Sequence, residues 1–168
     1  DLGTSEVYNN KITTISSTAT GANANNVIRG IRVNGNAFAA TITRVYNNSI
    51  SNLQSGNTNA TLTTRRIIGL SLQPAGSGAG SGIYAEFNSV RIGASNLAVS
   101  NACLERGTGS GPVYKVRNNI LANVTAAQTG GAKHYCWVST QAAGVGASGS
   151  LSNYNDLYVI NTNGFVGL

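Results

Sequence analysis

Short segments in which apolar and polar residues alternate recur along the chain. Segments 28–33 (IRGIRV) and 67–72 (IIGLSL) match position for position at a separation of 39 residues, and both alternate in their second half. Alternation with a period of two is typical of a β-strand that buries one face and exposes the other. Segments 96–100 and 135–139 are looser counterparts. The pattern predicts short strands that repeat at a regular spacing.

A second motif, an apolar or aromatic residue followed by a polar pair, recurs with a similar spacing. It reads VYNN at 7–10 and 45–48, EFNS at 86–89, VRNN at 116–119 and NYND at 153–156. The Asn residues that mark it are separated by 38, 41, 30 and 37 residues: Asn9, Asn47, Asn88, Asn118 and Asn155. An aliphatic residue follows each pair closely: Ile12, Ile50, Val90, Ile120 and Leu157. Two series of markers with one spacing indicate an internal repeat.

Asn at a repeated turn has a physical purpose. Asn tolerates the left-handed backbone conformation better than other non-glycine residues. Amides stacked in successive repeats can also donate to one neighbour and accept from the other, which forms a ladder. We therefore expect a structural Asn corner made by Asn9, Asn10, Asn47, Asn48, Asn88, Asn118, Asn119 and Asn155.

The composition narrows the fold class to all-β. Asn, Gly, Ser and Thr make up about 45% of the chain and charged residues only 10%. Because these four residue types are unfavourable in helix interiors, the composition disfavours a helical fold. We predict a right-handed parallel β-helix of about four to five coils, a single segment over residues 1–168. Glycine-rich stretches at 74–82, 107–112 and 142–150 are predicted to be loop insertions. The alternative is a β-sandwich with ordinary Asn-rich turns.

The elements VYNNxI, VRNNIL and IRGIRV resemble the repeats of right-handed parallel β-helix proteins, from residue 7 to about residue 159. They are similar to those of large secreted or cell-surface proteins of Bacteroidota. The resemblance implies an extracellular or cell-surface location and an adhesin or polysaccharide-handling role. It also implies export by the type 9 secretion machinery, which would then be a partner. It is specific for the fold and poorly specific for activity.

Other partners are expected from what the sequence lacks. The chain contains no Met and shows no amphipathic helix at either end. We therefore expect a segment of a longer chain, with further coils or another polypeptide covering the ends of the solenoid. No apolar run is long enough for membrane insertion. The formal charge of +6 is scattered along the chain, so we expect no nucleic-acid partner.

Catalysis by acid pairs has little support in the sequence. Parallel β-helices include polysaccharide lyases and hydrolases, and a hydrolase needs convergent carboxylates. Of five acids, Glu86 and Asp156 flank the predicted corner, two coils and about 10 Å apart. Lys115, Arg117 and Arg91 could act as lyase bases, but no acidic cluster accompanies them to hold Ca²⁺. We predict a non-enzymatic protein, with a polysaccharide lyase or hydrolase using Glu86 and Asp156 as the alternative.

The cysteines and the histidine offer neither a metal site nor a cofactor site. Cys103, Cys136 and His134 supply at most three of the four ligands that structural zinc needs. His134 and Cys136 lack a third group that would activate a nucleophile. Cys103 and Cys136 are 33 residues apart, close to one coil. This spacing predicts a disulfide between adjacent coils in an exported protein, with two free buried thiols as the alternative.

Aromatic residues favour binding over turnover. Several of them stand at alternating strand positions, where they either stack on sugar rings or fill the core: Tyr8, Tyr46, Tyr84, Tyr114, Tyr135, Tyr154, Tyr158 and Trp137. We therefore expect an adhesin-like stalk, or a surface that presents a polysaccharide or another cell-surface ligand.

Overall fold

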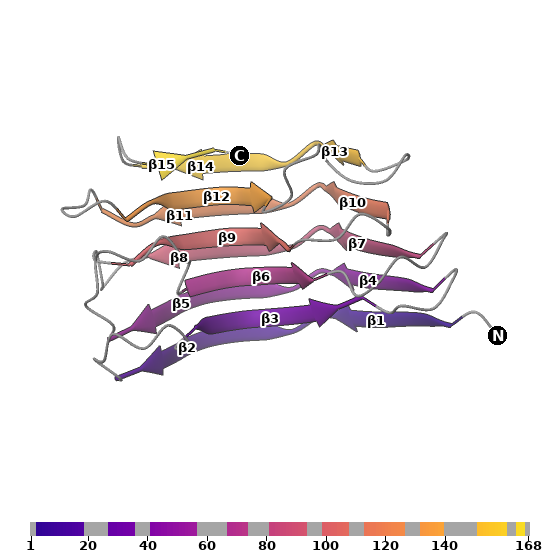
Figure 1. Ribbon diagram of the computed structural model, residues 1–168, viewed down its shortest axis with the longest axis horizontal. Helices are drawn as coiled ribbons and strands as arrows, with labels where there is room; N and C mark the ends of the chain where they lie inside the picture. Colours follow the sequence, from indigo (N-terminus) through magenta and orange to yellow (C-terminus); the bar gives the residue numbers. More distant parts are fainter. Residues whose placement is uncertain are drawn as a thin grey trace.

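Three parallel β-sheets make up the part of the chain that the structure, a computed structural model, describes (Figure 1). The described residues are 3–18, 27–35, 41–56, 67–73, 81–93, 99–107, 113–126, 132–139, 151–160 and 164–166. Within these ranges all regular structure is β-strand, and no helix is long and apolar enough to cross a membrane.

Each sheet contains five strands, which follow one another at every third position in the chain. Sheet A has the order β1 (Thr4–Tyr8), β4 (Ile42–Tyr46), β7 (Gly82–Glu86), β10 (Val113–Arg117) and β13 (Leu151–Asn153). Sheet B has the order β2 (Lys11–Ser17), β5 (Ser49–Ser55), β8 (Ser89–Gly93), β11 (Ile120–Val124) and β14 (Asp156–Val159). Sheet C has the order β3 (Ile28–Asn34), β6 (Ile67–Gln73), β9 (Asn101–Arg106), β12 (His134–Ser139) and β15 (Gly164–Phe165).

This topology is consistent with a parallel β-helix. Three consecutive strands contribute one strand to each sheet, and the next three stack on them in the same order. Every strand pairing in the described ranges is parallel: the β1–β4 pairing in sheet A, the β2–β5 pairing in sheet B and the β3–β6 pairing in sheet C begin the three ladders. The β-sandwich alternative is wrong, because sandwiches are built from antiparallel sheets.

The predicted alignment of 28–33 with 67–72 matches the register of β3 and β6, in which Ile31 faces Leu70 and Val33 faces Leu72. The prediction for the following strand is wrong. Residues 99–100 lie outside strands, and β9 begins only at Asn101, which faces Ile67. Residues 96–98 of the predicted segment lie outside the described part of the chain.

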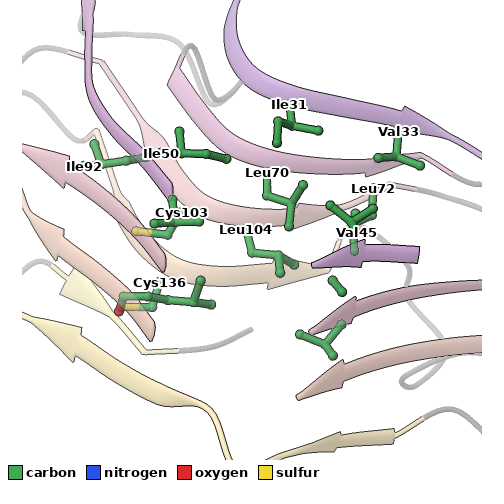
Figure 2. Packing of buried hydrophobic residues seen from close by; sticks show 14 of the residues in the cluster. Ile31, Val33, Val45, Ile50, Leu70, Leu72, Ile92, Cys103, Leu104 and Cys136 are labelled. Atoms are coloured by element: carbon green, nitrogen blue, oxygen red, sulfur yellow. The ribbon is translucent and has the colours of Figure 1, made fainter. Parts of the chain in front are cut away.

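Aliphatic side chains stack between the sheets to form the core. Leu70 and Leu104 lie one above the other on neighbouring strands of sheet C, beside Val45 of sheet A and Ile50 of sheet B (Figure 2). All four are fully buried or nearly so. Burying such side chains contributes roughly 1.5–3 kcal/mol each, so the core rows are the main stabilising feature of the stack.

The aliphatic residue that follows the polar pair does not occupy the same strand position in every repeat. In sheet B the row Ile12, Ile50, Val90, Leu121 and Leu157 is in register and faces the core. Ile120, the aliphatic residue that directly follows Asn119, faces outward and is 53% exposed. Because successive strand residues point to opposite faces, a shift of one position moves a side chain out of the core.

The predicted glycine-rich loops lie largely outside the described residues, at positions 74–80, 108–112 and 142–150. At their edges, Gly82 is the first residue of β7 rather than a loop residue, and Gly107 directly follows β9.

Candidate functional site

A ladder of Asn side chains marks the corner between sheets A and B. The Nδ2 group of each Asn donates a hydrogen bond to Oδ1 of the next. The distances are 2.9 Å from Asn10 to Asn48, 3.0 Å from Asn48 to Asn88, 3.0 Å from Asn88 to Asn119 and 2.9 Å from Asn119 to Asn155. The backbone N–H of the donating residue reaches the same Oδ1 atom, as Asn48 N does to Asn88 at 3.2 Å.

The ladder is saturated by the protein itself. The Nδ2 group of Asn48 also donates to Val7 O at 2.9 Å, and that of Asn88 donates to Val45 O at 2.9 Å. Asn48 is 2% exposed and Asn88 is 1% exposed. Because these amides are buried and hydrogen-bonded, the corner joins repeats and offers little to a ligand.

Two adjacent residues form the corner in each repeat: one adopts the left-handed conformation, and the next carries the ladder amide. The sequence pattern had assigned both roles to a single Asn. The left-handed conformation falls on the residue before each ladder Asn, with φ between 53° and 57°: Asn9, Asn47, Phe87, Asn118 and Tyr154. The series Asn9, Asn47, Asn88, Asn118 and Asn155 therefore mixed the two positions. All eight expected Asn residues lie at the corner, three in the left-handed position and five in the ladder.

The outer face of sheet A gathers the aromatic and charged side chains that could contact a ligand. One row of register partners contains Glu6, Arg44, Tyr84 and Lys115 from β1, β4, β7 and β10. The next row contains Tyr8, Tyr46, Glu86 and Arg117 from the same strands. We call these two rows the sheet A face.

Tyr84 lies at the centre of the first row, between two cations. Lys115 Nζ is 4.5 Å from the centroid of the Tyr84 ring, and Arg44 Cζ is 6.0 Å from it. Gly82 makes room for the ring on the same strand. A Cβ added at Gly82 would come within 2.7 Å of Tyr84 Cε1. The sequence did not reveal the importance of this glycine, because the ring reaches back over it only in the folded strand.

Tyr8 and Tyr46 stack in the second row, with ring centroids 5.1 Å apart and an interplanar angle of 3°. Tyr8 is exposed. Of the other candidate aromatics, Tyr114 and Tyr135 are buried and unavailable to a sugar, which agrees with the core-filling alternative. Tyr154 lies exposed at the corner, Tyr158 lies exposed on sheet B, and Trp137 is half-buried against the core.

The two acids considered for catalysis do not form a pair facing one site. Glu86 ends β7 in sheet A, whereas Asp156 begins β14 in sheet B, beyond the Asn corner. Glu86 Oε1 accepts a hydrogen bond from Arg117 Nε at 2.5 Å in an ion pair. The two acids therefore lie on different sheets and two repeats apart in the stack.

The two cysteines are free buried thiols, which was the alternative to the predicted disulfide. They occupy matching positions on β9 and β12, because the residues on either side of them are in register (Figure 2). Cys136 Sγ is directed to the carbonyl oxygens of Leu121 and Tyr158, at 3.1 and 2.9 Å. Burial raises the pKa of the Cys103 thiol, which disfavours the reactive thiolate.

Next to the aliphatic core, near the start of β9 and β12, lies a cluster of buried polar side chains. Asn123 Nδ2 donates to Asn101 Oδ1 at 2.7 Å, Asn101 Nδ2 donates to Thr125 Oγ1 at 3.0 Å, and Thr125 Oγ1 donates to Asn123 Oδ1 at 2.7 Å. His134 is the register partner of Asn101, is fully buried, and has no hydrogen-bond partner at either ring nitrogen. Burial lowers the pKa of His134 to about 4.

A second polar position lies at the other end of the same strands. Arg106 is fully buried, and its Cζ lies 4.3 Å from the centroid of the Tyr114 ring. Burial raises the pKa of Tyr114 to about 12. The sequence pattern did not indicate either group, because their strand positions hold aliphatic residues in β3 and β6, such as Ile28, Ile67 and Leu72.

Within the described ranges, no three Cys, His, Asp or Glu side chains lie close enough together to hold a metal ion. The sheet A face combines aromatic and charged side chains on one surface, so it is the candidate binding surface. Comparison of the chain with protein-family models, with curated proteins and with solved structures finds no match in any of the three.

Proposed function

We propose that this chain is a right-handed parallel β-helix of five coils that presents a carbohydrate-binding surface without catalysing a reaction. The three ladders of parallel strands support the β-helix, since each takes every third strand. The resemblance of the repeats supports a place in a large secreted or cell-surface adhesin of the type 9 secretion class.

The proposal of carbohydrate binding rests on the sheet A face. Tyr8, Tyr46 and Tyr84 lie within two adjacent rows, so their rings are held on one rigid surface. A sugar ring has an apolar face that packs on an aromatic ring and polar edges that hydrogen-bond to nearby groups. Side chains already ordered by stacking lose less conformational entropy on binding, which favours affinity.

The ion pair of Glu86 argues against turnover. A general acid must be free to transfer a proton to the leaving group, whereas the Glu86 carboxylate is held by Arg117. Asp156 lies on the neighbouring sheet and cannot complete a pair on the same face. The lyase or hydrolase alternative therefore has no arrangement of described residues that favours it.

Affinity electrophoresis of the chain in gels containing different polysaccharides tests the proposal. We expect retardation by at least one polysaccharide, and at least a several-fold loss of affinity in the double variant Tyr8→Ala/Tyr46→Ala. Tyr158→Ala is the matched control, because Tyr158 is an exposed tyrosine on sheet B. Absence of retardation by the whole panel, or an equal loss in Tyr158→Ala, would contradict the proposal.

The same samples test the absence of catalysis. The chain is incubated with each retained polysaccharide, and new reducing ends or unsaturated products are measured. We expect none above background. Depolymerisation that disappears in Glu86→Gln or Asp156→Asn would establish the enzymatic alternative instead.

A further inference from the structure

We infer that the ligand of the sheet A face is an acidic polysaccharide, which lies across the strands and over the row that contains Arg44, Tyr84 and Lys115. This inference rests on the proposed function and specifies the chemical class of the ligand. Its basis is the charge on this face.

The two cations of the row are arranged on either side of one aromatic ring. Arg44 on β4 and Lys115 on β10 are register partners of Tyr84 on the intervening strand β7. Neighbouring strands lie about 4.8 Å apart, so the backbones of β4 and β10 are separated by about 10 Å. The row therefore presents two positive charges with an apolar ring between them.

The acids of the face leave the charge of Lys115 uncompensated. Glu86 is engaged by Arg117. Glu6 is the register partner of Arg44 on the side away from Tyr84, so it lies nearer Arg44 than Lys115. The other register neighbour of Lys115 is Leu151. No carboxylate of the described residues lies within ion-pair distance of Lys115.

A polymer of acidic sugars matches this arrangement. Its rings can pack on tyrosine, and its carboxylate or sulfate groups can pair with cations at intervals along the chain. Ionic hydrogen bonds from Lys and Arg are stronger than neutral ones. A neutral polysaccharide would leave Lys115 without an anionic partner.

The direction of the row predicts that the polymer crosses the strands. Arg44, Tyr84 and Lys115 come from three successive strands of sheet A, so a ligand that contacts all three runs along the stacking direction. Tyr8 and Tyr46 lie in the adjacent row on β1 and β4. A bound polymer can therefore contact the stacked pair and the Tyr84 row together.

Affinity measurements with polygalacturonate and with a neutral glucan test the inference on the same preparations. Lys115→Gln should weaken polygalacturonate binding about two- to five-fold, the range expected for one screened ion pair. Raising the ionic strength from about 0.05 to 0.5 M should weaken it further. Lys11→Gln, which removes a lysine from sheet B, is the matched control and should have little effect.

Glu6→Gln supplies a test in the opposite direction. Removing this carboxylate frees Arg44 from a neighbouring negative charge, so the affinity for polygalacturonate should rise relative to the affinity for the neutral glucan. A variant that merely damaged the fold would not gain affinity.

The outcomes separate the inference from the proposed function. One outcome is that the neutral glucan binds in a tyrosine-dependent manner and Lys115→Gln affects the binding of no ligand. It would overturn the inference of an acidic ligand and leave the carbohydrate-binding function intact. Binding of no polysaccharide would overturn both. Equal binding of a single-stranded nucleic acid would show a general polyanion site and would also overturn the acidic polysaccharide.

Discussion

Asn48 donates a hydrogen bond from Nδ2 to Oδ1 of Asn88 at 3.0 Å, although 40 residues separate them in the chain. Asn48 Oδ1 in turn accepts from Asn10, and Asn88 Nδ2 donates to Asn119. Each inner amide of the ladder thus acts as donor and acceptor at once. An amide side chain can also donate a second hydrogen to a backbone carbonyl, as Asn48 Nδ2 does to Val7 O, whereas a carboxylate has no hydrogen to donate and a hydroxyl has only one.

We predict that Asn48→Asp strongly destabilises the fold. The carboxylate cannot donate to Asn88 Oδ1 or to Val7 O, and it places a charge in a buried site. Unpaired buried acceptors and an uncompensated buried charge together suggest a loss of about 3 kcal/mol or more in the free energy of unfolding. Urea unfolding followed by circular dichroism measures the loss.

Asn47→Asp is the matched control for this prediction. Asn47 adopts the left-handed conformation and is exposed, and Asp tolerates this conformation nearly as well as Asn does. The expected change is within about 0.5 kcal/mol. Similar losses in the two variants would show that a negative charge destabilises either corner position. The loss in Asn48→Asp could then not be assigned to the hydrogen bonds of the ladder.

The ladder also shows what the sequence could reveal about the fold. In VYNN and VRNN either Asn could occupy either corner position, so spacing alone could not separate the two. EFNS and NYND contain the necessary signal, because Phe87 and Tyr154 precede the ladder residues Asn88 and Asn155. Alignment on these two motifs would have corrected the register by one residue.

The sheet A face could not be predicted in the same way. Arg44, Tyr84 and Lys115 are 40 and 31 residues apart, and their alignment depends on segments of unequal length between the strands. The same limit applies to the placement of Glu86 and Asp156. Both flank the corner in the sequence, but they belong to different sheets.

We predict that Phe87→Asn stabilises the fold. Phe87 has φ of 57°, and its side chain is 58% exposed, so an aromatic residue holds a conformation that Asn adopts more readily. The left-handed conformation costs ordinary residues roughly 1–2 kcal/mol. We expect a gain of about 0.5–1 kcal/mol, measured by urea unfolding.

Ile120→Asn is the matched control for this gain. Ile120 is similarly exposed but lies in the extended strand β11, so the substitution relieves no backbone strain there. If Ile120→Asn gained the same unfolding free energy, the effect would come from removal of an exposed apolar side chain and not from the backbone conformation.

We predict that Gly69→Ala disrupts the packing between sheets B and C. A Cβ at Gly69 would collide with Cγ1 of Val90 and would lie 2.6 Å from the carbonyl oxygen of Cys103. The carbonyl belongs to the neighbouring strand and cannot move away easily. Overpacking of this kind costs roughly 1–3 kcal/mol. Gly93→Ala is the control, because its nearest contacts would lie at 3.6 Å, and a comparable loss there would contradict the packing argument.

We predict that His134 makes the fold sensitive to mild acid. Its pKa is about 4 in the folded state because of burial, against 6.5 when unfolded, so the unfolded chain binds a proton that the folded chain does not. The stabilisation is complete above pH 6.5 and is lost as the pH falls towards 4. Between pH 7.5 and 4.5 we expect His134 to account for about 1–3 kcal/mol of lost unfolding free energy. His134→Phe keeps an aromatic ring and removes the titration. Urea unfolding at the two pH values should therefore show a smaller drop in this variant, and an unchanged drop would assign the acid sensitivity to other groups.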